Sequence, residues 1–481
     1  MSYTPLDEMP KIRDSLRATF RKGVPRPLAW RRHQLLQLAR MMQENSDAFV
    51  EALAADLGRP KLESLVAEVC VVIDRAMICA EKLDEWTKPE KVEVPDWQKS
   101  WSPTIHKGSK GTVLIISPWN FPLILTFQPL YGAISAGCCA VIKLSEVSAN
   151  FGALLAKLLP KYLDQSAYRV VLGAVPEITK LLELQWDHIF YTGNGRVARI
   201  IAAAAARHLT PITLELGGKS PVIVDGTFDI DLAAKRILWG KSNNAGQMCV
   251  SPDYVLVLRE LQDKFVAALK AAHDIFYPEG PLNSTSFSRV VSEAHFKRLN
   301  GLLSRTKGEI VFGGKTNEKF WFEPTIVKDV ADGDSLLEEE IFGPILPVVP
   351  VDSVHDAIEF INARDDPLVL YAFTEDLQAK QAIIENTTSG NLVFNDTVQQ
   401  LSVKELPFGG VGESGYGRQI LKYSYEIFTY ERSCVDIPKS AEPSLSVRYP
   451  PYTQEKVDAL STQLHIKIPD SAPPSGNGYA H

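Results

Sequence analysis

GTVLIISPWNFPLILTFQPLYGAISAGCCAVIKLSE, residues 111–146, contains two short apolar runs separated by a helical window. The runs at 111–118 and 139–144 have the length of buried strands, and the window at 123–137 has the length of a helix. The same alternation continues with strand-like runs at 168–173, 188–193 and 211–216 and helical windows at 147–163, 176–184 and 195–208. This order predicts an α/β fold with a parallel sheet and crossover helices. A less regular alternation extends from 221 to about 395.

Composition sets the broad class. The chain has 481 residues, 45% hydrophobic and 23% charged, which is ordinary globular composition and long enough for two or three domains. The net charge is −7, and no basic run stands out. Because nucleic-acid binders usually present a basic face, we expect no nucleic-acid partner.

The six cysteines show no C-x-x-C pairing, so the sequence predicts reduced thiols and no metal site. The first twenty residues lack the apolar stretch of a signal peptide. No window reaches the ~18–20 apolar residues that cross a bilayer. We therefore expect a cytoplasmic protein without a transmembrane anchor.

Both ends of the chain differ from this alternating region. Residues 29–57 and 61–87 carry apolar residues at helical spacing, with Gly58 as a helix-ending signal between them, and they predict a helical hairpin. Residues 90–110 hold two tryptophans and two prolines and predict an inserted excursion, in the form of a hairpin. From 441 to 481 the chain is rich in Pro, Ser and Gly, which predicts an extended or disordered tail.

Cys249, in NNAGQMCVSPDYVL, follows a helical window and precedes an apolar run. A nucleophilic thiolate needs a lowered pKa and partial exposure, and the small residues Ala245 and Gly246 would give access. The alternative is a buried cysteine that fills the core, since free cysteine behaves as a small hydrophobe. Taken alone, the residue does not decide between the two.

Glu215 and Asn120 are the other two polar residues in positions that need explanation. Glu215 stands in the apolar run of PITLELGGKSP, where burial would raise its pKa and suit a general base; a strand-end carboxylate at the surface is the alternative. Asn120 follows the run 111–118, where its amide would face a ligand and stabilise an oxyanion; a simple turn between two prolines is the alternative.

GNGRVA, residues 193–198, follows a strand-like run and opens a helix, as a phosphate-binding glycine loop does. The acidic residue expected about 20 positions later is absent, because residue 214 is Leu. Lys143 and Glu146, after another strand-like run, are better candidates for a ribose site. A solvated pair of loop charges is the alternative for these two residues.

Together these stretches resemble the aldehyde dehydrogenase superfamily. The matching motifs occur in the family's order over roughly 430 residues and are PWNFP (118–122), KLSE (143–146), YTGNGRV (191–197), TLELGGKSP (213–221), NNAGQMC (243–249), EEIFGP (339–344) and LPFGGVGESGYG (406–417). The class 3 and fatty aldehyde branch is the most similar, through EALAADLG (51–58), HLTPITLELGGKSP (208–221), PDYVL (252–256), HFKRL (295–299) and VRYPPY (447–452).

The resemblance implies a covalent mechanism. Cys249 would attack the aldehyde carbonyl, and the Asn120 amide with the Cys249 backbone N–H would hold the oxyanion. Hydride transfer to the nicotinamide would leave a thioester, which water activated by Glu215 would hydrolyse to a carboxylic acid. The residues that match the family's dinucleotide-binding positions are Trp119, Lys143, Glu146, Gly193, Gly217, Glu340 and Phe342. Glu146 favours NAD, and NADP stays possible because class 3 enzymes accept both.

Several residues depart from the family pattern. Asn194 and Gly195 stand where Ser and Thr are common, which puts the pyrophosphate contacts in question. Met248 replaces the usual Thr before the nucleophile. The Tyr-His-Gly that follows the last glycine-rich motif in class 3 is replaced by Gln419, Ile420 and Leu421.

The family fold implies a Rossmann-like dinucleotide-binding domain (1–92 and 111–213), an α/β catalytic domain (214–395) and a small bridging or oligomerisation element (93–110 and 396–440), followed by the tail (441–481). Within 396–440 it implies that 429–437 forms the bridging strand. The branch implies a homodimer. Apolar residues near the motifs, such as Phe121 and Met248, favour a hydrophobic aliphatic or aromatic aldehyde.

Two other functions are compatible with this scaffold. An acylating dehydrogenase would pass the thioester to coenzyme A, but that branch typically lacks the base at Glu215. A catalytically silent binding protein would not need Cys249, Glu215 and Asn120 together.

Overall fold

The computed structural model describes residues 3–469 and divides into two compact units. Unit 1 comprises the residues up to Lys88 together with Lys107–Tyr430. Unit 2 comprises Pro89–His106 and the residues from Glu431 onward. Apart from residues 89–92, which belong to unit 2, the predicted separation of dinucleotide-binding and catalytic domains concerns regions inside unit 1, and residues 396–430 also belong to that unit.

The first sheet of unit 1 is built from the five apolar runs that the sequence predicts as strands. It has the order β15-β7-β6-β3-β4-β5. The strands are β3 (Thr112–Ile116), β4 (Cys139–Lys143), β5 (Tyr168–Val171), β6 (His188–Gly193), β7 (Ile212–Leu216) and the short β15 (Gly415–Tyr416). All pairs are parallel except β15 with β7. The predicted parallel sheet is confirmed.

The four predicted crossover helices are also present, as α6 (Ile124–Ala136), α7 (Ala149–Tyr162), α8 (Val175–Leu182) and α9 (Gly195–Ala206). The chain runs from β3 through β4 to β5 on one side and then returns to β6 and β7 on the other side of β3. The strand order therefore reverses between β3 and β6, which is where open α/β sheets bind ligands at their carboxyl edge.

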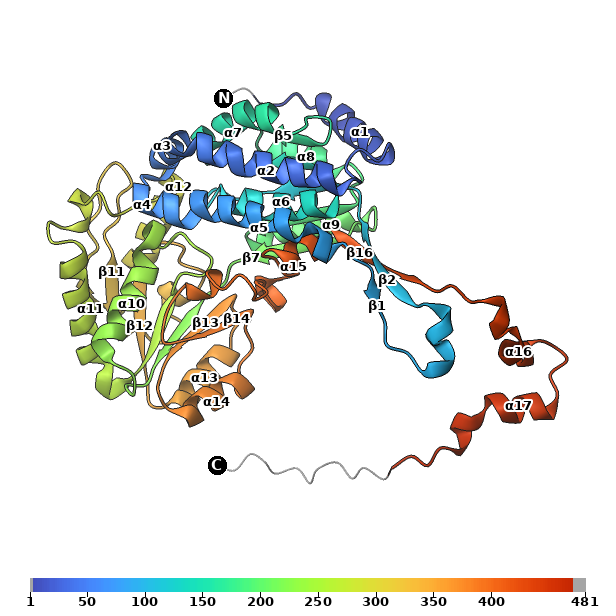
Figure 1. The fold of residues 1–481 in the computed structure, drawn as a ribbon. Coiled ribbons are helices and arrows are strands. Elements are labelled where there is room, and N and C mark those ends of the chain that lie inside the picture. Colours follow the sequence, from blue (N-terminus) through green and yellow to red (C-terminus); the bar gives the residue numbers. More distant parts are fainter. Residues whose placement is uncertain (1–2, 470–481) are drawn as a thin grey trace. The chain divides into compact units, whose positions relative to one another are not determined.

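The second sheet of unit 1 has the order β10-β11-β12-β9-β8-β13-β14. Its strands are β8 (Pro221–Val224), β9 (Tyr254–Leu258), β10 (Glu309–Phe312), β11 (Thr325–Lys328), β12 (Ile345–Val351), β13 (Val369–Phe373) and β14 (Asn391–Phe394). Only β10 is antiparallel to its neighbour. Figure 1 shows the helices that cover this sheet: α10 (Ile230–Ser242), α11 (Gln262–Phe276), α12 (Glu293–Arg305), α13 (Val354–Asn362) and α14 (Leu377–Asn386).

Strand periodicity explains how these helices cover both faces. Val222 and Val224 belong to the apolar cluster that includes residues of α10 and α11, whereas Ile223 belongs to a second cluster with residues of α12, α13 and α14. Successive side chains of a strand point to opposite faces, so each face has its own core. Buried strands of this kind read as continuous apolar runs.

The N-terminal helices depart from the prediction. The expected single helix over 29–57 is wrong, because Asn45 separates α2 (Leu28–Glu44) from α3 (Ser46–Leu57). The Asn45 side chain donates to the Met41 carbonyl at 2.9 Å, a local bond that competes with continued helix. A further helix, α1 (Glu8–Arg21), was not predicted.

The return half of the predicted hairpin is confirmed. Gly58 adopts a left-handed φ of 63° at the end of α3. The chain then continues through α4 (Lys61–Ser64), one π-helical turn (Leu65–Val69) and α5 (Cys70–Trp86). Figure 1 shows α2 and α5 side by side, and the two helices are in contact.

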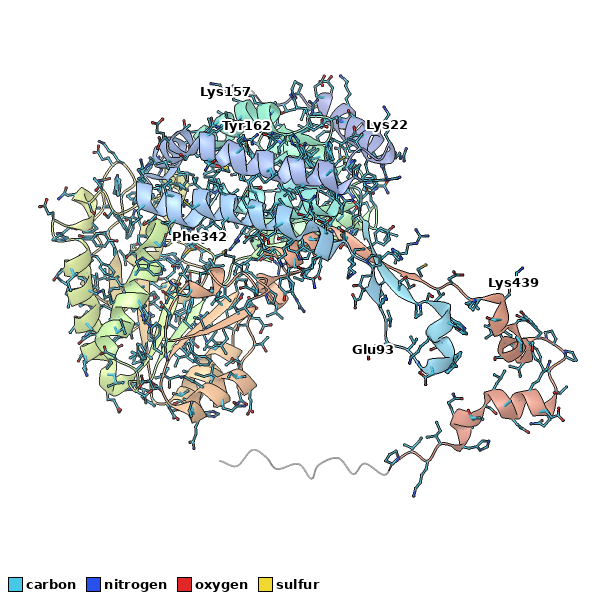
Figure 2. All side chains as sticks on the ribbon, in the orientation of Figure 1. Lys22, Glu93, Lys157, Tyr162, Phe342 and Lys439 are labelled. Atoms are coloured by element: carbon cyan, nitrogen blue, oxygen red, sulfur yellow. The ribbon has the colours of Figure 1, made fainter. Side chains whose placement is uncertain are left out.

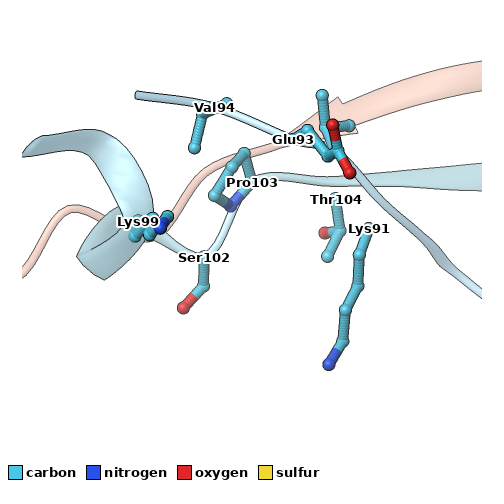
Figure 3. A pocket seen from close by; sticks show the side chains of 8 residues that line it. Lys91, Glu93, Val94, Lys99, Ser102, Pro103 and Thr104 are labelled. Atoms are coloured by element: carbon cyan, nitrogen blue, oxygen red, sulfur yellow. The ribbon is translucent and has the colours of Figure 1, made fainter. Parts of the chain in front are cut away.

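A separate three-stranded sheet has the order β1-β2-β16, with β1 (Glu90–Lys91), β2 (Thr104–Ser109) and β16 (Thr429–Cys434). The hairpin expected over 90–110 is therefore present, with a 3₁₀ helix at Asp96–Trp101 between its strands. A pocket of about 570 Å³ lies in this hairpin, lined by residues such as Lys91, Glu93 and Lys99 (Figure 3). No residue predicted for catalysis lines it.

The tail is less extended than its composition predicts. Short helices, α16 (Glu442–Leu445) and α17 (Gln454–Leu460), occupy part of it, and residues 470–481 of the predicted tail lie outside the described residues. Over residues 3–469, none of the helices combines the length and apolar character that a membrane crossing requires.

Candidate active site

The two sheets of unit 1 are joined by the four residues 217–220, between the end of β7 and the start of β8. The loop after β3, which carries Asn120, and the loop after β6 leave the same carboxyl edge because these strands are parallel. Glu215 lies at the fourth position of β7, near that edge. The predicted site residues therefore gather where one sheet passes into the other.

The Cys249 loop has a strained backbone. After α10, Asn244 and Ala245 adopt left-handed φ angles of 48° and 52°. Non-glycine residues hold this conformation only where surrounding contacts determine it. Here the Asn244 Nδ2 donates to the carbonyls of Asn120 and Gln247, both at 3.0 Å, and Gln247 Nε2 donates to Asn244 and Arg289 carbonyls at 3.0 Å.

Asn120 is brought to the nucleophile loop. Its side chain is buried, and its Nδ2 donates to the Gln247 carbonyl at 3.1 Å, two residues before Cys249. A carboxamide nitrogen carries two hydrogens. The bond to Gln247 uses one of them and fixes the plane of the amide, which leaves the second available to a ligand. The turn-only alternative for Asn120 does not account for this bond.

Cys249 is partly exposed, and its surroundings raise rather than lower its pKa. Burial of the thiol is the main cause, and the nearby carboxylates of Glu340 and Glu215 add to it, so the pKa of Cys249 rises to about 12. The lowered pKa that a nucleophilic thiolate needs is therefore absent at Cys249 in the free protein. The N–H groups of Cys249 and Val250 oppose the shift. The same interactions place both carboxylates near the sulfur.

Glu215 is buried, with only 3% of its surface exposed. Neither carboxylate oxygen has a hydrogen-bond partner among the described residues. Burial holds the pKa of Glu215 well above its ordinary value, and the neighbouring Gln419 amide opposes this only in part, without forming a bond of normal geometry. The surface alternative for Glu215 is wrong, and the raised pKa expected of a general base is present.

Gly217, in the segment that joins β7 to β8, packs closely against the Glu340 side chain. A Cβ on Gly217 would lie 2.3 Å from a Glu340 carboxylate oxygen, so a larger residue there would have to displace the Glu340 side chain. Burial raises the pKa of Glu340 to about 8, with the Gly218 N–H opposing. Phe342, labelled in Figure 2, has a left-handed φ of 43°. Its ring meets the Trp119 ring edge-on, with the ring centroids 5.5 Å apart. Three predicted dinucleotide-binding residues, Glu340, Phe342 and Trp119, therefore share one region with Gly217.

The remaining dinucleotide candidates lie at the carboxyl ends of β4 and β6. Lys143 Nζ lies 3.7 Å from the Glu146 carboxylate, and burial lowers the pKa of Lys143. Gly193 ends β6, and Asn194 caps α9 by accepting from the Val197 N–H at 3.0 Å. The unusual Asn194 therefore serves as a helix cap. The N-terminus of α9 supplies free N–H groups and a positive dipole end, which suit a pyrophosphate.

Sequence reasoning assigned no role to the polar residues that hold these loops. Asn244 and Gln247 are fully buried, and the Tyr371 hydroxyl donates to the Val250 carbonyl at 2.6 Å. The Tyr371 hydroxyl therefore anchors the nucleophile loop. A usable signal was present: uncharged amides in a stretch otherwise made of small and apolar residues.

Comparisons with known proteins agree with this geometry. The aldehyde dehydrogenase family model matches residues 7–434. Aldehyde dehydrogenase family 3 member B2 of Mus musculus is 44% identical over 439 residues, 91% of each chain. Family 3 member I1 of Arabidopsis thaliana, a chloroplastic protein, is 41% identical over 95% of this chain and 83% of its own. A substrate-bound structure of Staphylococcus aureus AldH superimposes with a TM-score of 0.91 at 38% identity, covering 94% of this chain and 99% of that one.

The family, the class 3 branch and the α/β fold inferred from the motifs are thereby confirmed. The chain belongs to the aldehyde dehydrogenase family and is an enzyme that oxidises aldehydes to carboxylic acids with NAD(P)⁺.

Proposed function

We propose that this enzyme works through a thioester on Cys249, with Asn120 as oxyanion donor and Glu215 as general base. One observation carries the proposal: the Asn120 amide is bonded to Gln247, two residues from Cys249, while the unpartnered Glu215 carboxylate is close enough to raise the pKa of the thiol. This proximity of three chain segments supports a site that combines a nucleophile, a donor and a base.

The Cys249 thiol gives its proton to solvent and forms a C–S bond to the aldehyde carbon, and the resulting oxyanion accepts hydrogen bonds from Asn120 Nδ2 and the Cys249 N–H. NAD(P)⁺ supplies the hydride acceptor when bound. Departure of hydride leaves the acyl group on sulfur. Glu215 then takes a proton from water as it adds to the thioester, and the C–S bond breaks to give the acid and the Cys249 thiolate, which regains a proton from Glu215.

The structure offers residues that fit the dinucleotide. Because Gly217 has no side chain, a dinucleotide can approach the backbone closely beside Glu340. Helix α9 presents its N-terminus just after Gly193. Lys143 and Glu146 would hold the adenine ribose. We propose that the Glu146 carboxylate accepts from the ribose 2′-hydroxyl and repels a 2′-phosphate, so that the enzyme prefers NAD.

Glu146→Gln should change the cofactor preference. Removing the negative charge relieves repulsion of the 2′-phosphate, so kcat/KM for NADP should rise relative to NAD by about tenfold, or about 1.4 kcal/mol. Steady-state kinetics with both cofactors measure the ratio. Glu183→Gln, which removes an exposed carboxylate paired with Lys180, is the matched control and should leave the ratio unchanged. An unchanged ratio in Glu146→Gln would remove Glu146 from the ribose site.

We propose a hydrophobic aldehyde as substrate, because Phe121 and Met248, which flank Asn120 and Cys249 in sequence, are apolar and largely buried. Hexanal, hexadecanal and benzaldehyde should each exceed succinic semialdehyde in kcat/KM by at least about tenfold, since burying each CH₂ contributes about 0.8 kcal/mol. The assay should include coenzyme A and identify the product. Free acid is expected; a preference for the acidic semialdehyde refutes the substrate class, and accumulation of acyl-CoA refutes hydrolysis by Glu215.

The oligomeric state of the enzyme and its cellular compartment are predictions. A homodimer follows from the branch resemblance and is measurable by light scattering. A reducing, cytoplasmic location is consistent with the free thiols of all six cysteines.

A further inference from the structure

Arg59 lies directly after the left-handed Gly58, at the entry to α4, and its side chain is fully buried. The guanidinium forms an ion pair with Glu68 and donates to the Asn120 carbonyl. Its Nε also donates to the Asn244 side-chain oxygen at 3.3 Å. A residue of the N-terminal helices therefore reaches the loop of the oxyanion donor and the loop of the nucleophile at once.

Glu68 holds the other end of the Asn120 loop. One carboxylate oxygen pairs with Arg59, and the other accepts from the N–H groups of Leu123 and Ile124 at 2.7 and 3.1 Å. Those N–H groups belong to the start of α6, immediately after the loop. The ion pair therefore contacts the Asn120 loop both at Asn120 itself and where the loop becomes helix.

The hydrogen bonds of Arg59, Asn244 and Gln247 meet at Asn120. The Asn120 carbonyl accepts from Arg59 and from Asn244 Nδ2, and the Asn120 amide donates to Gln247. The Arg59 guanidinium also lies over the Phe121 ring, 4.2 Å from its centroid. Arg59 contacts Asn120 and Phe121 on one side, and the nucleophile loop bonds Asn120 on the other. The direction of the Asn120 amide therefore depends on the position of Arg59.

Stability alone does not require such a pair. Removing two charges from water costs several kcal/mol per ion, and apolar side chains of similar volume often replace a buried pair without loss. What an apolar pair cannot supply is directed hydrogen bonding from one guanidinium to two separate loops.

We propose that the Arg59–Glu68 pair is a positioning device that aligns the Asn120 amide with the Cys249 thiol. The proposal rests on the oxyanion and nucleophile roles proposed above. It predicts that the pair affects formation of the acyl-enzyme and leaves dinucleotide binding unchanged, because neither residue contacts the Glu340 and Gly217 region in any of its bonds.

The test is the apolar replacement Arg59→Met/Glu68→Leu. The rate constant for NADH formation in the first turnover should fall by about 100-fold, the effect of misplacing a reacting group by about 1 Å. The dissociation constant for NADH should stay within twofold. Arg59→Lys, which keeps the charge but lacks the forked donors, should recover part of the rate and provides a second variant if the double variant does not fold.

Arg75→Met/Gln128→Leu is the matched control. Arg75 is also a buried residue of the N-terminal helices. It donates to the Gln128 side chain and to the Leu401 carbonyl at 2.8 Å, and neither bond involves a residue of the Asn120 loop or the Cys249 loop. The control should keep the wild-type first-turnover rate. An equal fall in the control, or a wild-type rate in Arg59→Met/Glu68→Leu, overturns the proposal.

A double-mutant cycle separates this proposal from the function on which it rests. If Arg59 acts through Asn120, replacing the pair in an Asn120→Ala background should lower the first-turnover rate by no more than about threefold further. A fully additive loss overturns the positioning role while leaving the oxyanion role intact. A wild-type rate in Asn120→Ala alone overturns the oxyanion role instead.

Discussion

Cys249→Ser should lower the rate of NADH formation by roughly 10⁴-fold or more, because losing a covalent nucleophile removes most of the chemical rate enhancement. A serine hydroxyl ionises far less readily than a thiol. In a site whose burial and whose carboxylates, Glu340 and Glu215, already raise the pKa of Cys249 to about 12, it would gain no activation. Single-turnover absorbance measurements with saturating aldehyde would show neither a burst nor steady turnover.

The matched control is Cys70→Ser, which changes an exposed thiol on α5 and should keep full activity. NADH binding, followed by fluorescence, should be the same in both variants, since the thiol holds no part of the dinucleotide in this account. Retention of even a tenth of the activity in Cys249→Ser would exclude Cys249 as the nucleophile.

Glu215→Gln should separate the two halves of the reaction. The first turnover should still produce a burst of about one NADH per active site, whereas the following steady state should slow by about 10²–10⁴-fold, the usual contribution of a general base. Glutamine has nearly the same size, so the buried space is preserved while the proton acceptor is lost. Stopped-flow absorbance measures both phases.

The pH dependence gives a second result for Glu215. Its pKa is raised by burial, so the carboxyl is protonated and inactive as a base at low pH and becomes active as pH rises through that pKa. The wild-type hydrolysis rate should therefore increase with pH, and Glu215→Gln should lose this increase. Glu177→Gln, which alters another buried carboxylate that caps α8, should retain it. A missing burst with normal steady turnover in Glu215→Gln would contradict the assigned role.

The first sheet was predictable because its local signals agree. Each strand from β3 to β7 is a short apolar run bounded by glycine or polar residues, and each helix between them has its own periodic face. The end of the α3 segment was equally clear, since Gly58 takes the left-handed conformation that glycine favours. Burial on both faces of a parallel sheet left little ambiguity about strand position.

The N-terminal region shows where sequence patterns were insufficient. The break at Asn45 depends on a side-chain bond within an otherwise continuous apolar pattern. Helix α1 carries Met9, Ile12 and Leu16 at helical spacing, a signal that our prediction, which began at residue 29, did not use. The tail helices α16 and α17 have no buried residues that a pattern could reveal.

The residue types of the candidate site follow from the sequence. The pKa values of their side chains do not. Motif order identifies Cys249, Glu215 and Asn120, but the pKa of a thiol depends on which charges the fold brings near it. The two carboxylates that raise it, Glu340 and Glu215, come from distant segments. Arg59 likewise looks like an ordinary surface residue after a helix end, and only the fold shows that its side chain is buried.

The acyl intermediate itself is the most direct test of the thioester mechanism. Glu215→Gln mixed with hexanal and NAD should be quenched in acid within the burst phase, digested, and analysed by mass spectrometry. The account predicts a hexanoyl group on the peptide that contains Cys249, absent without NAD. An unmodified Cys249 peptide after a full burst of NADH, or an acyl group on any other residue, would contradict it.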